Sequence, residues 1–170
     1  MKTWMGLLLV ALAAPVMADD AADVKAQGDA FVRAWDAGDV KATLSLYADD
    51  ARVIWPGQGD EAKGKAAIEA LLTRTFKMFP KSGLVPKSQD TIPLGNGYIA
   101  NVGFWDHTVP GPDGKPATFR IRTSEILKRQ GDKLLYVVDH ASIGLPPPPP
   151  AAAPAPAKKA GPATRKPSPR

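Results

Sequence analysis

No cysteine occurs in the 170-residue chain, and histidine occurs only twice. Without cysteine the protein cannot form disulfides, so its stability must come from an ordinary hydrophobic core. The sequence also lacks a glycine-rich phosphate loop, a nucleophile elbow, a Ser–His–Asp arrangement and a histidine pair at the H-x-x-x-H spacing of metal sites. We therefore expect no cofactor and no metal ion.

Long hydrophobic runs are absent as well. The apolar run at residues 5–14 ends at Pro15, whereas a membrane-spanning helix needs about 20 apolar residues. With Lys2 before it and the small residues of Val16-Met17-Ala18 after it, this run has the pattern of an export signal. We expect residues 1–18 to be a cleaved signal peptide, with a mature chain that starts at Asp19 and a periplasmic or secreted location. An uncleaved anchor is the alternative.

Acidic and large apolar residues are missing from residues 146–170, which are rich in proline, alanine and lysine. Proline fixes φ and lacks an N–H group, so this stretch favours extended polyproline II over helix or sheet. Because it has nothing large to bury, the composition predicts a disordered tail.

The excess of basic residues lies outside the middle of the chain. The whole sequence has 22 Lys and Arg against 17 Asp and Glu, whereas residues 19–145 have 16 against 17. The positive net charge therefore indicates a nearly neutral domain with a cationic tail, and we expect no nucleic-acid partner. The tail is either a solubilising spacer or a weak, salt-sensitive attachment to an anionic envelope surface.

Residues 19–145 have a length that suits one domain with its own core. Apolar residues at helical spacing predict helices at residues 20–37 and 65–79. A short helix is expected between them, starting after Asp39, on which Val40, Leu44 and Tyr47 share one face.

Strand patterns occupy the rest of this region. Residues 51–55 are rich in β-branched and aromatic residues and are stopped by Pro56-Gly57. Four further strands are expected at residues 83–94, 98–109, 117–128 and 134–142. Prolines interrupt the first of these, residues 83–94, so we expect it to be an edge strand or an irregular one. This order predicts an α+β fold in which a curved antiparallel sheet wraps around three N-terminal helices, a cone-shaped α+β barrel.

Two segments carry a family resemblance. FVRAWDAGDVKATLSLYADDARVIWPG (residues 31–57) and the closing VVDHAS (residues 137–142) resemble the SnoaL-like superfamily, which shares its fold with nuclear transport factor 2 and ketosteroid isomerase. The resemblance covers residues 22–143 and implies a conical pocket that holds a mostly apolar ligand. It does not imply one chemistry, because the fold hosts enzymes, ligand binders and adaptors.

Ketosteroid isomerase provides a specific test, because it uses an Asp base with a Tyr and a protonated Asp as oxyanion donors. The resemblance places the catalytic Tyr at Phe31, which has no hydroxyl, and the base at Trp55, which is no base near neutral pH. Ser124 and Glu125 are the candidates for the oxyanion Asp. We therefore predict no ketosteroid isomerase activity.

Each histidine follows an aspartate, in Asp106-His107 and Asp139-His140. Adjacent strand residues point to opposite faces, so neither pair forms a local Asp–His couple. The resemblance implies that His140 and Ser142 lie at the pocket rim, where His140 has a suitable intrinsic pKa for a general base. Alternatively, His140 is a half-buried residue with a structural role only. A further, weaker alternative is a metal site formed by both histidines and the aspartates.

The candidates for acid–base chemistry are thus His140 and Asp106, with Tyr47 as a partner; alternatively, Tyr47 only packs its ring in the core. We expect the ligand-binding pocket to be formed by Phe31, Tyr47, Trp55, Phe104, Trp105, His107, His140 and Ser142.

The leading hypothesis is an exported domain that binds a small, mostly apolar molecule. The alternative is a SnoaL-like enzyme (cyclase, isomerase, dehydratase or hydrolase) that uses His140 or Asp106 as acid or base. A third hypothesis is a homo-oligomeric association module, and we expect a homodimer that pairs through the outer face of the sheet.

Overall fold

The computed structural model describes residues 19–57, 60–80, 82–111 and 113–144. The expected signal peptide and the expected tail lie outside the described residues. Within the described part of the chain, no helix is both long enough and apolar enough to cross a membrane.

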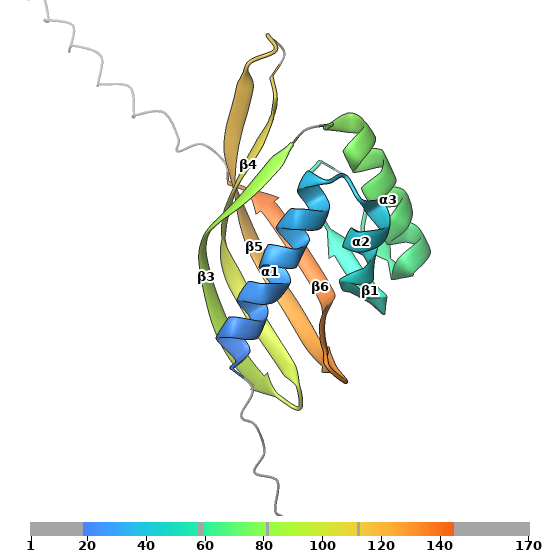
Figure 1. Cartoon of the computed structure of the whole chain (residues 1–170), viewed down its shortest axis with the longest axis vertical. Coiled ribbons are helices and arrows are strands. Elements are labelled where there is room, and N and C mark those ends of the chain that lie inside the picture. The colour runs from blue at the N-terminus through green and yellow to red at the C-terminus, as the bar shows by residue number, and fades with distance from the viewer. Residues whose placement is uncertain (1–18, 58–59, 81, 112, 145–170) are drawn as a thin grey trace, which may run out of the picture.

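Three helices cover the inner side of the sheet (Figure 1). Helix α1 (Asp20–Asp36) begins where the Asp19 side chain accepts a hydrogen bond from the Ala22 amide at 3.1 Å. It is followed by Gly38, whose φ of 62° suits a residue without a side chain. Asp39 caps helix α2 (Val40–Ser45) in the same way, and helix α3 spans Gly64–Met78.

Tyr47 corrects one expectation, because it begins strand β1 (Tyr47–Ile54) and does not continue α2. Helix α2 ends at this point because the Leu46 carbonyl accepts a hydrogen bond from the Tyr136 amide of strand β6, at 2.9 Å. The Lys65 ammonium also donates to the carbonyls of Leu44 and Tyr47, at 2.8 and 2.6 Å. Tertiary pairing therefore overrides the helical spacing of the sequence.

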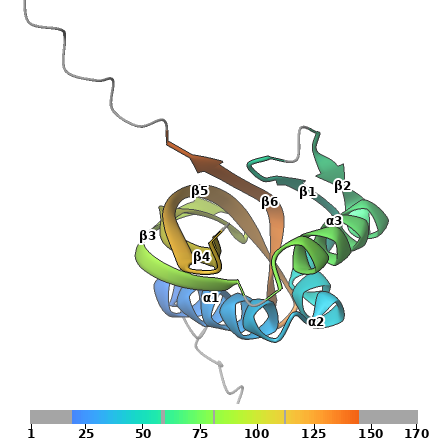
Figure 2. The ribbon, with the colours of Figure 1, turned by 90° about the horizontal axis from the view of Figure 1, so that it is seen from above.

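The sheet has six strands in the order β2-β1-β6-β5-β4-β3, and only β1 and β6 run parallel. The strands not yet delimited are β2 (Ala62–Lys63), which the sequence did not suggest, β3 (Gly83–Gly95), β4 (Tyr98–Pro110), β5 (Pro116–Gln130) and β6 (Lys133–Ile143). Seen from above, β3 to β6 form a curved sheet, and α1 lies along its concave side (Figure 2). The predicted α+β fold, with a curved and unclosed sheet over helices, is confirmed.

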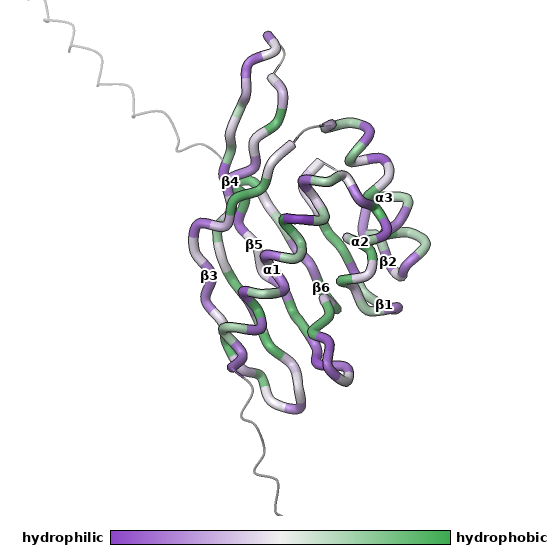
Figure 3. Tube along the Cα trace, in the orientation of Figure 1, coloured by the Kyte–Doolittle hydropathy of each residue, from purple (hydrophilic) through white to green (hydrophobic). Residues whose placement is uncertain are grey.

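Alternation along the strands sets which side chains face the helices. On β4, Ile99, Asn101, Trp105 and His107 are buried on the inner face, while Phe104 between them is exposed. Gly103 belongs to the inner set and has no side chain, which lets the Ser88 carbonyl of the bulged strand β3 approach closely. Hydrophobic residues recur along the strands, whereas the β5–β6 turn and the tip of the β4–β5 hairpin are hydrophilic (Figure 3).

Candidate functional site

A cavity of about 300 Å³ lies between the inner face of the sheet and the helices. Most of its wall is apolar and aromatic. The residues that line it are Phe31, Trp35, Trp55, Pro56, Gly57, Thr75, Phe79, Leu84, Trp105, His107, Phe119, Ile121, Thr123, Glu125, Tyr136, Asp139, Ala141 and Ile143.

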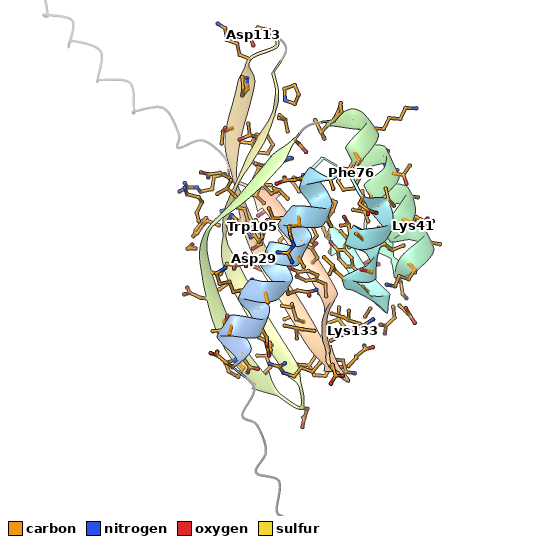
Figure 4. All side chains as sticks on the ribbon, viewed as in Figure 1. Asp29, Lys41, Phe76, Trp105, Asp113 and Lys133 are labelled. Atoms are coloured by element: carbon orange, nitrogen blue, oxygen red, sulfur yellow. The ribbon has the colours of Figure 1, made fainter. Side chains whose placement is uncertain are left out.

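Phe31 of α1 is the centre of the aromatic wall. Its ring lies 5.7 Å from the Trp35 ring, 5.9 Å from the Tyr136 ring and 6.4 Å from the Trp105 ring, between centroids. Trp105 lies between α1 and the sheet (Figure 4). The indole N–H of Trp35 donates to the Ser82 hydroxyl at 3.0 Å. Packing among these rings holds the wall in a defined shape.

Two carboxyl groups form the acidic part of the cavity wall. Glu125 on β5 and Asp139 on β6 are direct cross-strand partners, and Asn101 on β4 is the next residue in the same row. Both carboxyl residues are at most 5% exposed. The Tyr47 hydroxyl donates to Asp139 Oδ2 at 2.6 Å, and Asn101 Nδ2 donates to Glu125 Oε2 at 2.6 Å. Each carboxyl is therefore oriented by its own donor.

Burial governs how this pair titrates. Burial, followed by the nearby Asp139 charge, raises the pKa of Glu125 to about 8. Burial also raises the pKa of Asp139, although hydrogen bonds from Tyr47 and Trp55 and the nearby His140 oppose this shift. Glu125 consequently keeps its proton at pH 7 and can donate a hydrogen bond, while burial also favours the protonated form of Asp139.

The two tyrosines at this end of the cavity stay protonated at neutral pH. Burial raises the pKa of both Tyr47 and Tyr136 well above the ordinary value, and the neighbouring carboxyl groups act in the same direction. They can therefore only serve as hydrogen-bond partners or neutral walls near pH 7.

The buried polar atoms of the wall that lack a partner among the described residues include the Nε1 of Trp105 and the Nε2 of His107. Trp105 is 4% exposed and His107 is 7% exposed. Burial lowers the pKa of His107, so its ring is neutral at pH 7. An occupant of the cavity can satisfy these atoms, which otherwise keep an uncompensated desolvation cost.

Four of the residues predicted for the pocket, Phe31, Trp55, Trp105 and His107, line the cavity. A fifth, Tyr47, is 1% exposed and reaches the cavity only through its hydrogen bond to Asp139. The ring of Tyr47 packs in the core, as the second interpretation of this residue expects, and its hydroxyl binds Asp139 rather than His140 or Asp106.

The other predicted pocket residues, Phe104, His140 and Ser142, do not line the cavity and require a correction. They alternate with inward residues on β4 and β6, so their side chains lie on the outer face of the sheet. On β6 the residue that enters the cavity is Asp139, the neighbour of the predicted His140.

Asp106 also belongs to the outer face. Its carboxylate accepts from the Arg120 guanidinium at 3.1 Å and lies 3.8 Å from the Lys87 ammonium. Neither acid–base candidate taken from the sequence, His140 or Asp106, therefore lines the cavity. Between the two oxyanion candidates, Glu125 faces the cavity and Ser124 is exposed.

The pairing of Asp139 with Glu125 is the feature that sequence reasoning missed. The Asp139-His140 dipeptide did carry a signal, because strand alternation allows only one of its members to face inward. Which one does so depends on the register of β6 with β1 and β5. Among the described residues, no group of three His, Asp or Glu side chains is arranged to hold a metal ion.

Comparison with solved structures identifies the fold. A ketosteroid isomerase-like protein from Erwinia carotovora atroseptica is 16% identical, with 75% of this chain and 98% of that one covered and a TM-score of 0.64. A candidate dehydratase of the NTF2-like family from Streptomyces avermitilis is 16% identical over 75% and 98%, with a TM-score of 0.68. A candidate calcium/calmodulin-dependent protein kinase II association domain from Xanthomonas campestris is 20% identical over 78% and 93%, with a TM-score of 0.67.

Among curated protein sequences, no significant match to this chain is found. The family model described as a SnoaL-like domain matches residues 29–137, which span most of the described helices and strands. The resemblance inferred from residues 31–57 and 137–142 is thereby confirmed, and the chain belongs to the SnoaL-like domain family.

Proposed function

We propose that this domain binds a small, mostly apolar molecule in the cavity, with the polar end of the molecule at Glu125 and Asp139. The observation that carries the proposal is the combination of an aromatic wall with one buried, hydrogen-bonded carboxyl pair. Ligand sites typically pair a mostly apolar lining with a few oriented polar groups, in volumes of about 300–1,000 Å³. The partnerless atoms of Trp105 and His107 support the same use of the cavity.

A cavity-filling variant tests this proposal. Ala141 lines the cavity, so Ala141→Leu reduces its volume, whereas Ala100→Leu adds the same side chain on the outer face of β4. We expect 2-phenylethanol and cyclohexanone to raise the Tm of the wild type and of Ala100→Leu in a thermal-shift assay, and to lose this effect in Ala141→Leu. An equal rise in both variants, or no rise in the wild type, contradicts binding in the cavity.

Acid–base catalysis is the second candidate function, and the state of the carboxyl pair favours it. Asp139 is held by Tyr47 and can accept a proton, while Glu125 retains a proton near neutral pH. For a bound ketone, Asp139 would take the α-proton as the carbonyl oxygen accepts a hydrogen bond from Glu125. This assignment replaces the acid–base roles first considered for His140 and Asp106.

Deuterium washout from the α-carbons of cyclohexanone, followed by NMR, separates catalysis from binding alone. Faster washout with the protein, lost in Asp139→Asn and kept in the outer-face control Asp106→Asn, supports catalysis. If deuterium washout is no faster with the protein than in buffer alone, catalysis is contradicted and only the binding function is retained. We also propose that the protein has no ketosteroid isomerase activity, because Phe31 and Trp55 occupy the cavity wall where that enzyme needs a hydroxyl and a carboxylate.

We also propose that the protein is exported and that it forms a homodimer. Mass spectrometry of the protein from its host tests whether the mature chain starts at Asp19. The outer face of the sheet exposes apolar side chains such as Ile54 and Phe104, which are 43% and 44% exposed and could be covered in a homodimer. Light scattering that shows a monomer at high concentration contradicts the homodimer.

A further inference from the structure

We infer that the cavity selects a small organic cation, an amine whose ammonium group lies against Asp139 and Glu125 while its apolar body packs on the aromatic wall. This inference rests on the proposed binding function and specifies the chemical class of the ligand. It follows from the charges that surround the carboxyl pair and from the kind of side chain that fills the rest of the wall.

The cavity wall contains acidic groups without a matching base. Glu125 and Asp139 are the acidic residues in its described lining, which includes no Lys or Arg. His107 adds no positive charge because burial lowers its pKa. A buried carboxylate is costly unless a positive charge compensates it, and an ammonium ligand provides that charge.

The groups that face the carboxyl pair do not supply the missing charge. Tyr47 from β1, Tyr136 from β6 and Asn101 from β4 are neutral hydrogen-bond or packing partners. Trp55, at the end of β1, donates to Asp139 and is also neutral. His140 acts on Asp139 from the neighbouring position of β6 and does not line the cavity.

The aromatic wall suits a cation as well as an apolar body. Three indoles, those of Trp35, Trp55 and Trp105, line the cavity together with the rings of Phe31 and Tyr136. Among aromatic side chains, tryptophan has the ring face that attracts cations most strongly. An ammonium group bound at the carboxyl pair would therefore also contact aromatic ring faces that attract positive charge.

The same features disfavour the other ligand charges. An anion would place its charge beside Asp139 and Glu125 with no described cationic side chain in the wall to offset it. A neutral alcohol can hydrogen-bond to the pair, but unlike an ammonium it cannot compensate a negative charge there. Among ligands that share the same apolar part, we therefore expect the ammonium compound to bind most tightly, the alcohol less tightly and the carboxylate most weakly.

Three probes that differ only in the polar end test this order: phenethylamine, 2-phenylethanol and phenylacetate. Their binding to the full chain is followed at pH 7 by tryptophan fluorescence, since three of the four tryptophans line the cavity. We expect phenethylamine to bind about tenfold more tightly than 2-phenylethanol, which corresponds to about 1.4 kcal/mol. We expect phenylacetate to bind most weakly.

Two aspartate variants locate the selectivity. Asp139→Asn removes the charge from the cavity, and we expect phenethylamine and 2-phenylethanol to bind it with affinities that agree within about twofold. Asp106→Asn removes a charge from the outer face of the same sheet and should keep the tenfold preference. If Asp139→Asn does not fold, the wild type is measured between pH 5 and 8: the affinity for the amine should rise as the pair ionises, and that for the alcohol should not.

Each outcome decides between the two proposals. If 2-phenylethanol or phenylacetate binds as tightly as phenethylamine, the inference of a cationic ligand is wrong while binding in the cavity stands. If Asp139→Asn keeps the preference, the cation is not held by the carboxyl pair and the inference is also wrong. If none of the three probes changes the emission up to its solubility limit, both the inference and the proposed binding function fail.

Discussion

Replacing Glu125 by glutamine should change how the stability of the domain depends on pH. Glu125 is buried beside Asp139, and its pKa is raised from 4.5 to about 8. Below pH 4.5 both the folded and the unfolded chain carry a protonated Glu125, so this group costs no stability there. As the pH rises towards 8, the unfolded chain releases the proton while the folded chain retains it, and the free energy of unfolding falls.

The size of this effect follows from the shift. One pKa unit corresponds to about 1.4 kcal/mol, so the free energy of unfolding should fall by up to about 1.4 kcal/mol per pH unit between pH 4.5 and 8. The whole shift corresponds to a loss of at most about 5 kcal/mol in the free energy of unfolding, and the neighbouring Asp139 accounts for part of it. Glutamine keeps the shape and an oxygen for Asn101 but has no proton to lose.

Urea unfolding at a series of pH values measures the difference between Glu125→Gln and the wild type. The variant should gain stability relative to the wild type from pH 5 to 8, and the difference should level off above pH 8. Glu69→Gln, which removes an exposed carboxylate from α3, is the matched control and should give a difference that barely changes with pH. Parallel pH profiles for Glu125→Gln and the wild type would refute the burial argument.

Two further substitutions test the packing around the site. Tyr47→Phe removes the 2.6 Å hydrogen bond to buried Asp139, so urea unfolding should show a loss of about 1–3 kcal/mol; Tyr136→Phe is the control, and an equal loss there would contradict a special role for the Tyr47 hydroxyl. Gly103→Ala places a Cβ against a backbone carbonyl of β3 and should cost about 1–3 kcal/mol in the same assay. The control Gly83→Ala has open space around its Cβ, so equal stability of these two glycine variants would argue against the close strand approach.

Much of the fold can be predicted from local sequence patterns. Asp19 and Asp39 act as N-caps, and Gly38 separates the first two helices, as their residue types indicate. The inner set on β5, which includes Phe119, Ile121 and Thr123, follows the two-residue alternation that the sequence displays. These signals act over a few residues, so they can be recognised without knowing the rest of the chain.

The predictions that proved wrong concern residues whose positions depend on pairing with distant parts of the chain. Tyr47 continues the helical spacing of Val40 and Leu44, yet it pairs with Tyr136 of β6 and begins a strand. His140 and Asp139 are both plausible pocket residues by type, and alternation does not say which of them faces inward. Only the pairing of β6 with β1 and β5 makes Asp139 the inner residue.

Local patterns suffice to predict an α+β domain, because helix spacing, strand alternation and turn residues act over a few positions. The SnoaL-like family and its pocket were indicated by the resemblance of residues 31–57 and 137–142. The polar chemistry of the cavity, in contrast, depends on how distant strands pair. Asp139, Glu125 and Asn101 come from three strands and meet in one row, and the hydroxyl that holds Asp139 comes from Tyr47, which lies 92 positions earlier. The raised pKa values follow from burial, which exists only once the sheet has curved over the helices.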